Sequence, residues 1–180
     1  MSYTKHSIAK TTAQLIDSGD TIFINTSSTA LLVLRYLDQK YVTVITNNAK
    51  AVTCKSSPNV TIILTGGELR YPKESMVGDF ALQTIRNVSV SKSILGCSGF
   101  SLDIGMTTSI HSEVSINRLM LENCKGPRIL CVDHSKLGQT VNFISGNVTD
   151  FDVVVTDREA DTEFLSELAL DYKIKTIVAD

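Results

Sequence analysis

Hydroxyl, amide and cationic side chains recur directly after the short apolar runs of this sequence. The run Thr21 to Asn25 leads into the hydroxyl-rich loop Thr26 to Thr29, and the next run ends in Thr46 and Asn47. Such loops, together with the free backbone N–H groups of a helix that follows, suit an anion such as phosphate. A helix cap explains either loop equally well when it is taken alone, because Ser, Thr and Asn are preferred capping residues.

A pair of glycines and an arginine follow the third apolar run. Gly66 and Gly67 let the backbone turn tightly and approach a ligand, and Arg70 has the geometry to bind a phosphate through two parallel hydrogen bonds. An ordinary turn is the simpler interpretation of the glycine pair. The spacing matches neither the Gly-x-Gly-x-x-Gly of a dinucleotide site nor the Gly-x-x-x-x-Gly-Lys of a nucleotide-binding loop, so we expect neither cofactor.

Two further runs end in polar loops that carry a carboxylate and a lysine. The fourth run is followed by Gly99 and then by a polar loop with Gly105 and Thr107. The loop leads to Glu113 near a helix start, where a carboxylate either stabilises the helix dipole or holds sugar hydroxyls and moves protons. Lys136 follows the fifth run, where it is either solvated or neutralises a phosphate. One anionic, hydroxyl-rich small ligand accounts for all five loops together.

Short β-branched runs alternate with segments whose apolar residues have helical spacing. This alternation predicts a mostly parallel sheet with helices on both faces, a Rossmann-like α/β sandwich in three layers. Because ligand loops in such a sheet all follow the carboxyl ends of strands, we expect the polar loops to meet along one edge. The predicted strands are Thr21 to Asn25, Val42 to Asn47, Thr61 to Thr65, Ser93 to Cys97, Arg128 to Asp133, Asp152 to Asp157 and Thr176 to Ala179, and the predicted helices are Ile8 to Ile16, Leu31 to Leu37, Ala49 to Lys55, Met76 to Asn87, Ser112 to Cys124 and Thr162 to Tyr172.

The bulk composition fits one globular domain, residues 1–180, and argues against several classes of protein. The 180 residues are 43% hydrophobic and 20% charged, with a net charge of −2 that lacks the basic excess needed to hold a nucleic-acid backbone. The apolar runs are too short to span a bilayer, and the polar N-terminus lacks the apolar segment of a secretory signal, so we expect a cytoplasmic protein without membrane contact. The 4 cysteines form no Cys-x-x-Cys pair, which favours core packing over a metal site.

Taken together, the loops resemble those of the C-terminal domain of DeoR-family transcriptional repressors. The resemblance covers nearly the whole chain, and its motifs occur in order. They are Thr21-Ile22-Phe23-Ile24-Asn25 with Ser27-Ser28-Thr29, Ile45-Thr46-Asn47, Leu64-Thr65-Gly66-Gly67 with Arg70, Gly78, Gly96 with Gly99, Gly105 with Thr107, Glu113 with Arg118, Asp133 with Ser135-Lys136, and Val155-Thr156-Asp157.

The resemblance implies an effector-sensing domain with a fold similar to that of ribose-5-phosphate isomerase. It implies a phosphorylated sugar as effector, homo-oligomerisation, and operator DNA bound only through an N-terminal winged helix-turn-helix that is absent from this chain. We therefore expect a sensor and not an enzyme, with no cofactor and no metal. The expected effector-binding residues are Asn25, Ser27, Ser28, Thr29, Thr46, Asn47, Gly66, Gly67, Arg70, Gly99, Gly105, Thr107, Glu113 and Lys136.

Three positions depart from the family pattern. Asn25 stands where an aspartate is common, Ser27 replaces a glycine two residues later, and Asn117 replaces the lysine usual four residues after the glutamate. Loss of that lysine argues against isomerase-like catalysis and bears on how the phosphate is held.

Two other functions fit the same sequence. A sugar-phosphate isomerase or related hydrolase would use Glu113 as base, assisted by Asp103 or Lys136, because one fold hosts both kinds of activity. A structural or purely oligomeric α/β module would use the polar loops only as helix caps, and would leave the coincidence of five polar loops unexplained.

Overall fold

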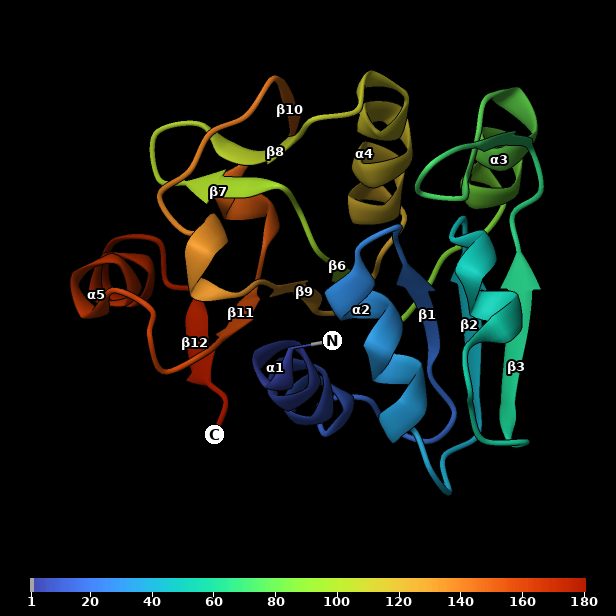
Figure 1. Cartoon of the computed structure of the whole chain (residues 1–180), viewed down its shortest axis with the longest axis horizontal. Helices are drawn as coiled ribbons and strands as arrows, with labels where there is room; N and C mark the ends of the chain where they lie inside the picture. Colours follow the sequence, from blue (N-terminus) through green and yellow to red (C-terminus); the bar gives the residue numbers. More distant parts are fainter. Residues whose placement is uncertain (1) are drawn as a thin grey trace.

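A seven-stranded parallel sheet forms the centre of the computed structural model, which describes residues 2–180 (Figure 1). Its strand order is β12-β11-β9-β6-β1-β2-β3. The seven strands predicted from the β-branched runs are the strands of this sheet, which confirms the α/β prediction. Their bounds are β1 (Thr21–Ile24), β2 (Val42–Thr46), β3 (Val60–Leu64), β6 (Lys92–Leu95), β9 (Arg128–Cys131), β11 (Val153–Thr156) and β12 (Lys175–Val178).

Helices cover both faces of this sheet and give the molecule three layers. The helix α1 (Tyr3–Ala13) packs with α2 (Ser28–Leu32) on one face, and α3 (Asp79–Arg86) packs with α4 (Val114–Glu122) on the other (Figure 1). At the end of the sheet, α5 (Thr162–Asp171) packs beside β12. Short 3-10 helices are η1 (Val33–Tyr36), η2 (Ala49–Thr53), η3 (His111–Glu113), η4 (His134–Lys136) and η5 (Val148–Asp150).

The strand β1 shows why the sheet must be covered twice. Ile22 and Ile24 pack into the core beneath α1 and α2, whereas Phe23 between them packs into the core beneath α3 and α4. Successive side chains of a strand point to opposite faces, so each face receives its own apolar set. All three side chains are fully buried, which explains why the strand reads as a continuous apolar run instead of an alternating one.

Two smaller sheets are absent from the sequence-based prediction. The strands β7 (Gly99–Ser101), β8 (Gly105–Thr108) and β10 (Phe143–Gly146) form an antiparallel sheet in which β8 is central. The segments β4 (Glu68–Arg70) and β5 (Ser75–Val77) form a hairpin. The strand β5 includes the start of the predicted helix Met76 to Asn87, which begins only at Asp79 because Gly78 adopts a φ of 85° that a right-handed helix does not allow.

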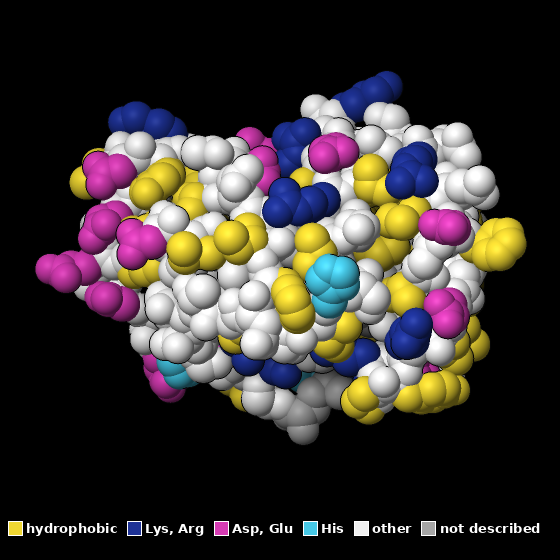
Figure 2. Space-filling model, turned by 90° about the horizontal axis from the view of Figure 1, so that it is seen from above, with side chains coloured by type: hydrophobic (Ala, Val, Ile, Leu, Met, Phe, Trp, Pro, Cys, Tyr) yellow, Lys and Arg dark blue, Asp and Glu magenta, His cyan; other side chains and the backbone are white. Residues whose placement is uncertain are grey.

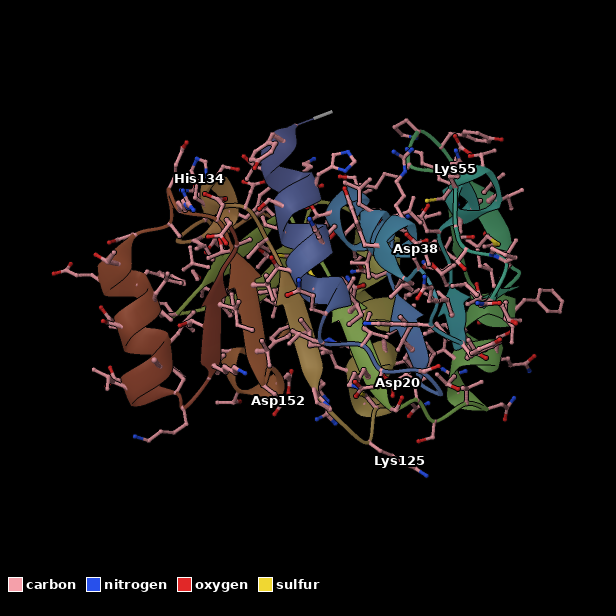
Figure 3. All side chains as sticks on the ribbon, turned by 90° about the horizontal axis from the view of Figure 1, so that it is seen from below. Asp20, Asp38, Lys55, Lys125, His134 and Asp152 are labelled. Atoms are coloured by element: carbon pink, nitrogen blue, oxygen red, sulfur yellow. The ribbon has the colours of Figure 1, made fainter. Side chains whose placement is uncertain are left out.

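The chain changes the direction in which it builds the sheet between β1 and β6. It first adds β2 and β3 on one side of β1, then returns to place β6 against the other side, and continues to β12. The loops after β1 and β6 therefore diverge at the carboxyl edge, where open α/β sheets bind their ligands. Figure 3 shows the two edges: Asp20 and Asp152 precede β1 and β11 at one edge, and His134 follows β9 at the opposite edge.

The surface is acidic at one end of the molecule. Acidic side chains gather over the end that carries α5 (Figure 2), and the exposed carboxylates of this helix and its N-terminal cap are Asp161, Glu163, Glu167 and Asp171. Within residues 2–180, no helix combines the length and apolar character that a membrane crossing requires.

Candidate functional site

A cavity of about 310 Å³ lies at the carboxyl edge of the sheet, where the loops after β1 and β6 diverge. The loop after β9, the tip of the β4–β5 hairpin and the segment between β8 and α4 complete its walls. This volume is at the lower end of the range for small-molecule sites, so the cavity suits a small ligand. Six of the predicted effector-binding residues line it, namely Asn25, Ser27, Ser28, Thr29, Glu113 and Lys136.

The buried side chain of Asn25 joins two walls of this cavity. Its Oδ1 accepts hydrogen bonds from the backbone N–H of Gly96 at 3.0 Å and of Ser27 at 3.3 Å. Its Nδ2 donates to the carbonyl of Gly96 at 2.9 Å and to Oδ1 of Asn117 at 3.1 Å. The carboxamide therefore fixes the loop after β1 against the loop after β6, and positions the hydroxyl groups that follow.

Those hydroxyl groups divide into a cap and a cavity surface. Ser27 Oγ accepts a hydrogen bond from the backbone N–H of Ala30 at 3.2 Å, and so caps α2. Ser28 Oγ instead accepts from Nζ of Lys5 at 3.0 Å, which brings a cation from α1 to the cavity wall. In this short loop, Ser27 thus caps α2 while Ser28 holds the Lys5 cation at the cavity wall.

Glu113 is the buried carboxylate of the site. Its side chain is 4% exposed. Oε1 accepts from the hydroxyl of Thr26 at 2.5 Å, and Oε2 accepts from the hydroxyl of Thr108 at 3.0 Å. Nζ of Lys73 lies 3.7 Å from Oε2. Hydroxyl donors to both oxygens and a nearby cation offset the cost of burying this carboxylate.

The 3-10 helix η4 presents Lys136 to the cavity from the β9 side. Asp133 caps this turn by accepting from the backbone N–H of Ser135 at 2.9 Å. His134 is held from the adjacent loop, because its backbone N–H donates to Oδ2 of Asp157 at 2.8 Å and its Nδ1 lies 3.0 Å from Oδ1 of the same carboxylate. These contacts fix the backbone that carries Lys136.

Two cysteines also line the cavity. Burial raises the pKa of the Cys97 thiol to about 12, against the opposing effect of the nearby Lys136 charge. Burial also raises the pKa of Cys131 to about 12, although a hydrogen bond with Thr12 acts in the opposite direction. Both thiols are therefore protonated at neutral pH and lack the thiolate that nucleophilic chemistry requires.

Eight predicted effector-binding residues lie outside the cavity lining, where direct effector contact stays a prediction. They are Thr46, Asn47, Gly66, Gly67, Arg70, Gly99, Gly105 and Thr107. Several of them have structural contacts. Thr46 Oγ1 donates to the carbonyl of Ile24 at 2.6 Å, and Asn47 Nδ2 donates to that of Met76 at 3.1 Å. Arg70 is an exposed side chain that pairs with Glu68 at 3.4 Å.

The glycines in this set allow close backbone approaches. A Cβ on Gly67, whose φ is 113°, would lie 2.6 Å from the carbonyl oxygen of Val77. A Cβ on Gly105, whose φ is 99°, would lie 2.4 Å from that of Gly146. The first close approach lies at the base of the β4–β5 hairpin, and the second lies in the antiparallel sheet. These glycines therefore allow the close backbone packing of two elements next to the cavity.

Three lysines of the lining, Lys5, Lys50 and Lys73, are not among the residues predicted from the sequence. Lys50 follows the polar loop after β2, so the pattern of the other strand ends extends to it. Lys5 comes from α1 and Lys73 from the hairpin tip, neither of which follows a strand of the central sheet. In the described part of the chain, no three His, Cys, Asp or Glu side chains are placed to hold a metal ion.

The fold is similar to those of solved structures of an enzyme and of a translation factor. Ribose 5-phosphate isomerase A from Methanocaldococcus jannaschii matches with a TM-score of 0.51 and 16% identity, over 74% of this chain and 53% of that chain. The translation initiation factor eIF-2B from Pyrococcus horikoshii OT3 matches with a TM-score of 0.53 and 19% identity, over 77% of this chain and 49% of that chain. The predicted likeness to the isomerase fold is confirmed, and at these identities it concerns the fold alone.

Among curated proteins, the chain is similar to regulators of transcription. It is 31% identical to YulB of Bacillus subtilis, an uncharacterized HTH-type transcriptional regulator, over 95% of this chain and 66% of that protein. It is 33% identical to the glycerol-3-phosphate regulon repressor of Escherichia coli, over 85% of this chain and 61% of that protein. The chain thus spans less than two thirds of the length of these relatives.

The family model of the DeoR C terminal sensor domain matches residues 2–158. This match covers most of the chain, and the relatives are named as regulators and repressors. The expectation of a DeoR-type sensor domain is thereby confirmed, whereas the absence of catalysis stays a prediction. The chain belongs to the family of DeoR C-terminal sensor domains.

Proposed function

We propose that this domain senses a phosphorylated sugar and that the bound sugar controls DNA binding by a separate N-terminal domain. The charge of the cavity carries the proposal. Its lining holds four lysines and two carboxylates, which leaves an excess of two positive charges. A phosphate monoester carries about −1.5 to −2 charges at neutral pH, and so compensates that excess. A neutral sugar would leave it uncompensated. The residues are Lys5, Lys50, Lys73, Lys136, Glu113 and Asp133.

The phosphate fits best beside the loop after β1. Lys5 already contacts this loop through Ser28, and Lys136 approaches the cavity from β9 on the other side of β6. Hydrogen bonds between cationic donors and phosphate oxygens are shorter and stronger than neutral ones, so this wall supplies the most favourable anion contacts.

The sugar hydroxyls then face Glu113. Thr26 and Thr108 donate to the two oxygens of this carboxylate. A carboxylate offers about four lone-pair sites, so acceptor capacity remains for a ligand. In this position Glu113 holds hydroxyl groups without transferring protons.

Other features of the site favour a sensor over an isomerase. Asn117 occupies the position where the family pattern has a lysine, and its amide is not a titratable group. It is also engaged in the hydrogen bond from Asn25. The two cavity thiols are protonated, as their pKa values of about 12 require. Asn117 therefore cannot take the proton-transfer role that the family lysine would have beside Glu113.

The relatives support the regulatory part of the proposal. One is a glycerol-3-phosphate regulon repressor, whose name refers to a phosphorylated small molecule, and another is an HTH-type regulator. We assign operator binding to a winged helix-turn-helix outside these 180 residues, because their net charge of −2 does not suit a DNA backbone. We further propose a cytoplasmic homo-oligomer. The exposed Ile63 and Leu64 on the edge strand β3 support association between subunits.

Calorimetry on this domain tests the proposal. Glucose 6-phosphate, fructose 1-phosphate and glycerol 3-phosphate would be titrated beside glucose, fructose and glycerol, and an isomerisation assay would follow on every hexose phosphate that binds. We expect at least one phosphorylated ligand to bind much more tightly than its free form, without turnover. Equal affinity for a sugar and its phosphate would contradict the phosphate assignment, and turnover of a bound ligand would make the site catalytic.

A further inference from the structure

Lys73 reaches the cavity from the tip of the β4–β5 hairpin. Its Nζ lies 3.7 Å from Oε2 of Glu113, and its side chain is 39% exposed whereas that of Glu113 is 4% exposed. The cation is thus partly open to an incoming ligand, whereas the carboxylate lies deeper in the wall. An ammonium donor and a carboxylate acceptor stand side by side on one surface of the cavity.

The backbone holds Lys73 in this place. The carbonyl of its neighbour Glu74 accepts from the N–H of Ala49 at 2.9 Å, and the N–H of Met76 donates to the carbonyl of Asn47 at 2.8 Å. These bonds tie the returning half of the hairpin to the loop after β2. A side chain carried on a fixed backbone loses less entropy on binding, so Lys73 is prepared for a contact before the ligand arrives.

The pair does not suit a phosphate. Any anion bound directly to Lys73 would also lie close to the buried charge of Glu113, and like charges at that range repel. A sugar hydroxyl suits both groups, because it donates one hydrogen bond and accepts others. Adjacent hydroxyl groups can therefore accept from the ammonium and donate to the carboxylate at the same time.

We propose that Lys73 and Glu113 together read the hydroxyl-bearing end of the effector, with Lys73 as a specificity-determining residue. This inference rests on the proposed function, in which the phosphate lies beside Lys5 and Lys136. The Lys73–Glu113 pair selects phosphorylated polyols and sugars that present neighbouring hydroxyl groups. A bare phosphate uses only the other end of the cavity.

The experiment compares inorganic phosphate with sugar phosphates, because the two probes separate the ends of the site. Calorimetric titrations with inorganic phosphate, glucose 6-phosphate, fructose 1-phosphate and glycerol 3-phosphate would be made on the unmodified domain and on K73M, K73R and K55M. Lys55 is an exposed lysine outside the cavity lining, between η2 and β3 (Figure 3), and serves as the matched control. Since K73M leaves the Glu113 charge without its cation, the double variant K73M/E113Q provides a charge-neutral second test.

We expect K73M and K73M/E113Q to lose about tenfold or more of the affinity for the best sugar phosphate, as for a lost hydrogen bond to a charged group. Affinity of K73M/E113Q for inorganic phosphate should stay within about twofold, because this double variant keeps the charge excess of the cavity. K73R should retain more sugar-phosphate affinity than K73M, and K55M should match the unmodified domain. An equal loss of affinity for inorganic phosphate and for the sugar phosphate, or no loss for either, would overturn the role of Lys73 and leave the proposed function standing. If the unmodified domain binds no phosphorylated ligand, the proposed function fails and this inference fails with it.

Discussion

The side chain of Asn25 forms hydrogen bonds with both backbone groups of Gly96, accepting from its N–H at 3.0 Å and donating to its carbonyl at 2.9 Å. The two residues follow β1 and β6, which are neighbours in the sheet but far apart in the sequence. This buried bidentate contact joins the two loops at the point where the sheet changes direction. The shape of the cavity therefore depends on one amide that need not touch the ligand.

Replacing this amide should cost stability as well as affinity. In Asn25→Ala, the N–H and carbonyl of Gly96 lose their buried partner, and a buried polar group left without a partner costs about 1 to 3 kcal/mol. We expect urea denaturation to show a loss of that order in the free energy of unfolding. The matched control is Asn142→Ala, which removes an exposed amide. An equal and small effect of both substitutions would show that the bidentate contact contributes little.

A methyl group at Gly96 should disturb the loop after β1. A Cβ there would lie 1.9 Å from Oγ and 2.3 Å from Cβ of Ser27, so the capping side chain has to move. We expect Gly96→Ala to lower the free energy of unfolding by about 1 to 3 kcal/mol, as overpacking does. The double variant G96A/S27G removes the atoms that clash, and glycine is tolerated at a helix cap at a cost of a few tenths of a kcal/mol. Thermal and urea denaturation should therefore show partial rescue, and a double variant no more stable than Gly96→Ala would exclude the clash as the cause.

The central sheet was predictable because most of its strands are buried on both faces, the edge strands β3 and β12 being the exceptions. Burial on both faces goes with continuously apolar, β-branched runs such as Val153 to Val155, which are a strong local signal. The antiparallel sheet of β7, β8 and β10 gives no comparable signal. Residues 99–108 contain glycines and hydroxyls, and β8 is completed by pairing with Phe143 to Gly146, far along the chain. Such pairing depends on tertiary structure and leaves little trace in the local pattern.

The site was predictable only where it follows strand ends. Ser28 and Lys136 were found because loops after parallel strands meet at one edge. Glu113 was found as the end of the polar segment after β6, although the antiparallel strands β7 and β8 lie between them. Lys73 was missed because a hairpin outside the central sheet carries it into the cavity. The same hairpin directs Arg70, a predicted phosphate ligand, outward to the exposed Glu68. A difference of three residues thus decides which cation of the hairpin lines the cavity, and the local sequence pattern does not show it.

At the opposite edge of the sheet, the Asp20–Lys92 ion pair should make stability depend on pH. Burial disfavours the charged form of Asp20, but hydrogen bonds from Lys92, the Asp17 backbone and Ser91 outweigh it and lower the pKa below its ordinary value of 3.8. A carboxyl whose pKa is lower in the folded state stabilises the protein above its unfolded pKa, and this stabilisation is lost as the pH falls through the folded value. The free energy of unfolding should therefore decline below about pH 4.

Urea denaturation between pH 7 and pH 3 measures this decline. Asp20→Asn removes the titrating group, so its free energy of unfolding should fall less steeply over the acidic range. Asp38→Asn alters an exposed aspartate for which no ion pair occurs within residues 2–180 (Figure 3), and should follow the unmodified domain. Parallel curves for Asp20→Asn and the unmodified domain would show that the pair does not govern acid stability.

The cations at positions 136 and 70 should differ sharply in their effect on binding. Lys136 lines the cavity, whereas Arg70 lies outside its lining with a side chain that is 58% exposed and paired with Glu68. We expect Lys136→Ala to weaken binding of a phosphorylated sugar by about 1.5 to 3 kcal/mol, the usual contribution of a hydrogen bond to a charged group. Binding of the free sugar should change little, because it lacks the phosphate. Arg70→Ala should leave the affinity for either ligand unchanged, and so controls for the removal of a positive charge from the domain. Calorimetry with a sugar and its phosphate on both variants decides the matter: if Arg70→Ala weakens phosphate-dependent binding and Lys136→Ala does not, the phosphate lies near the hairpin and not beside the loop after β1.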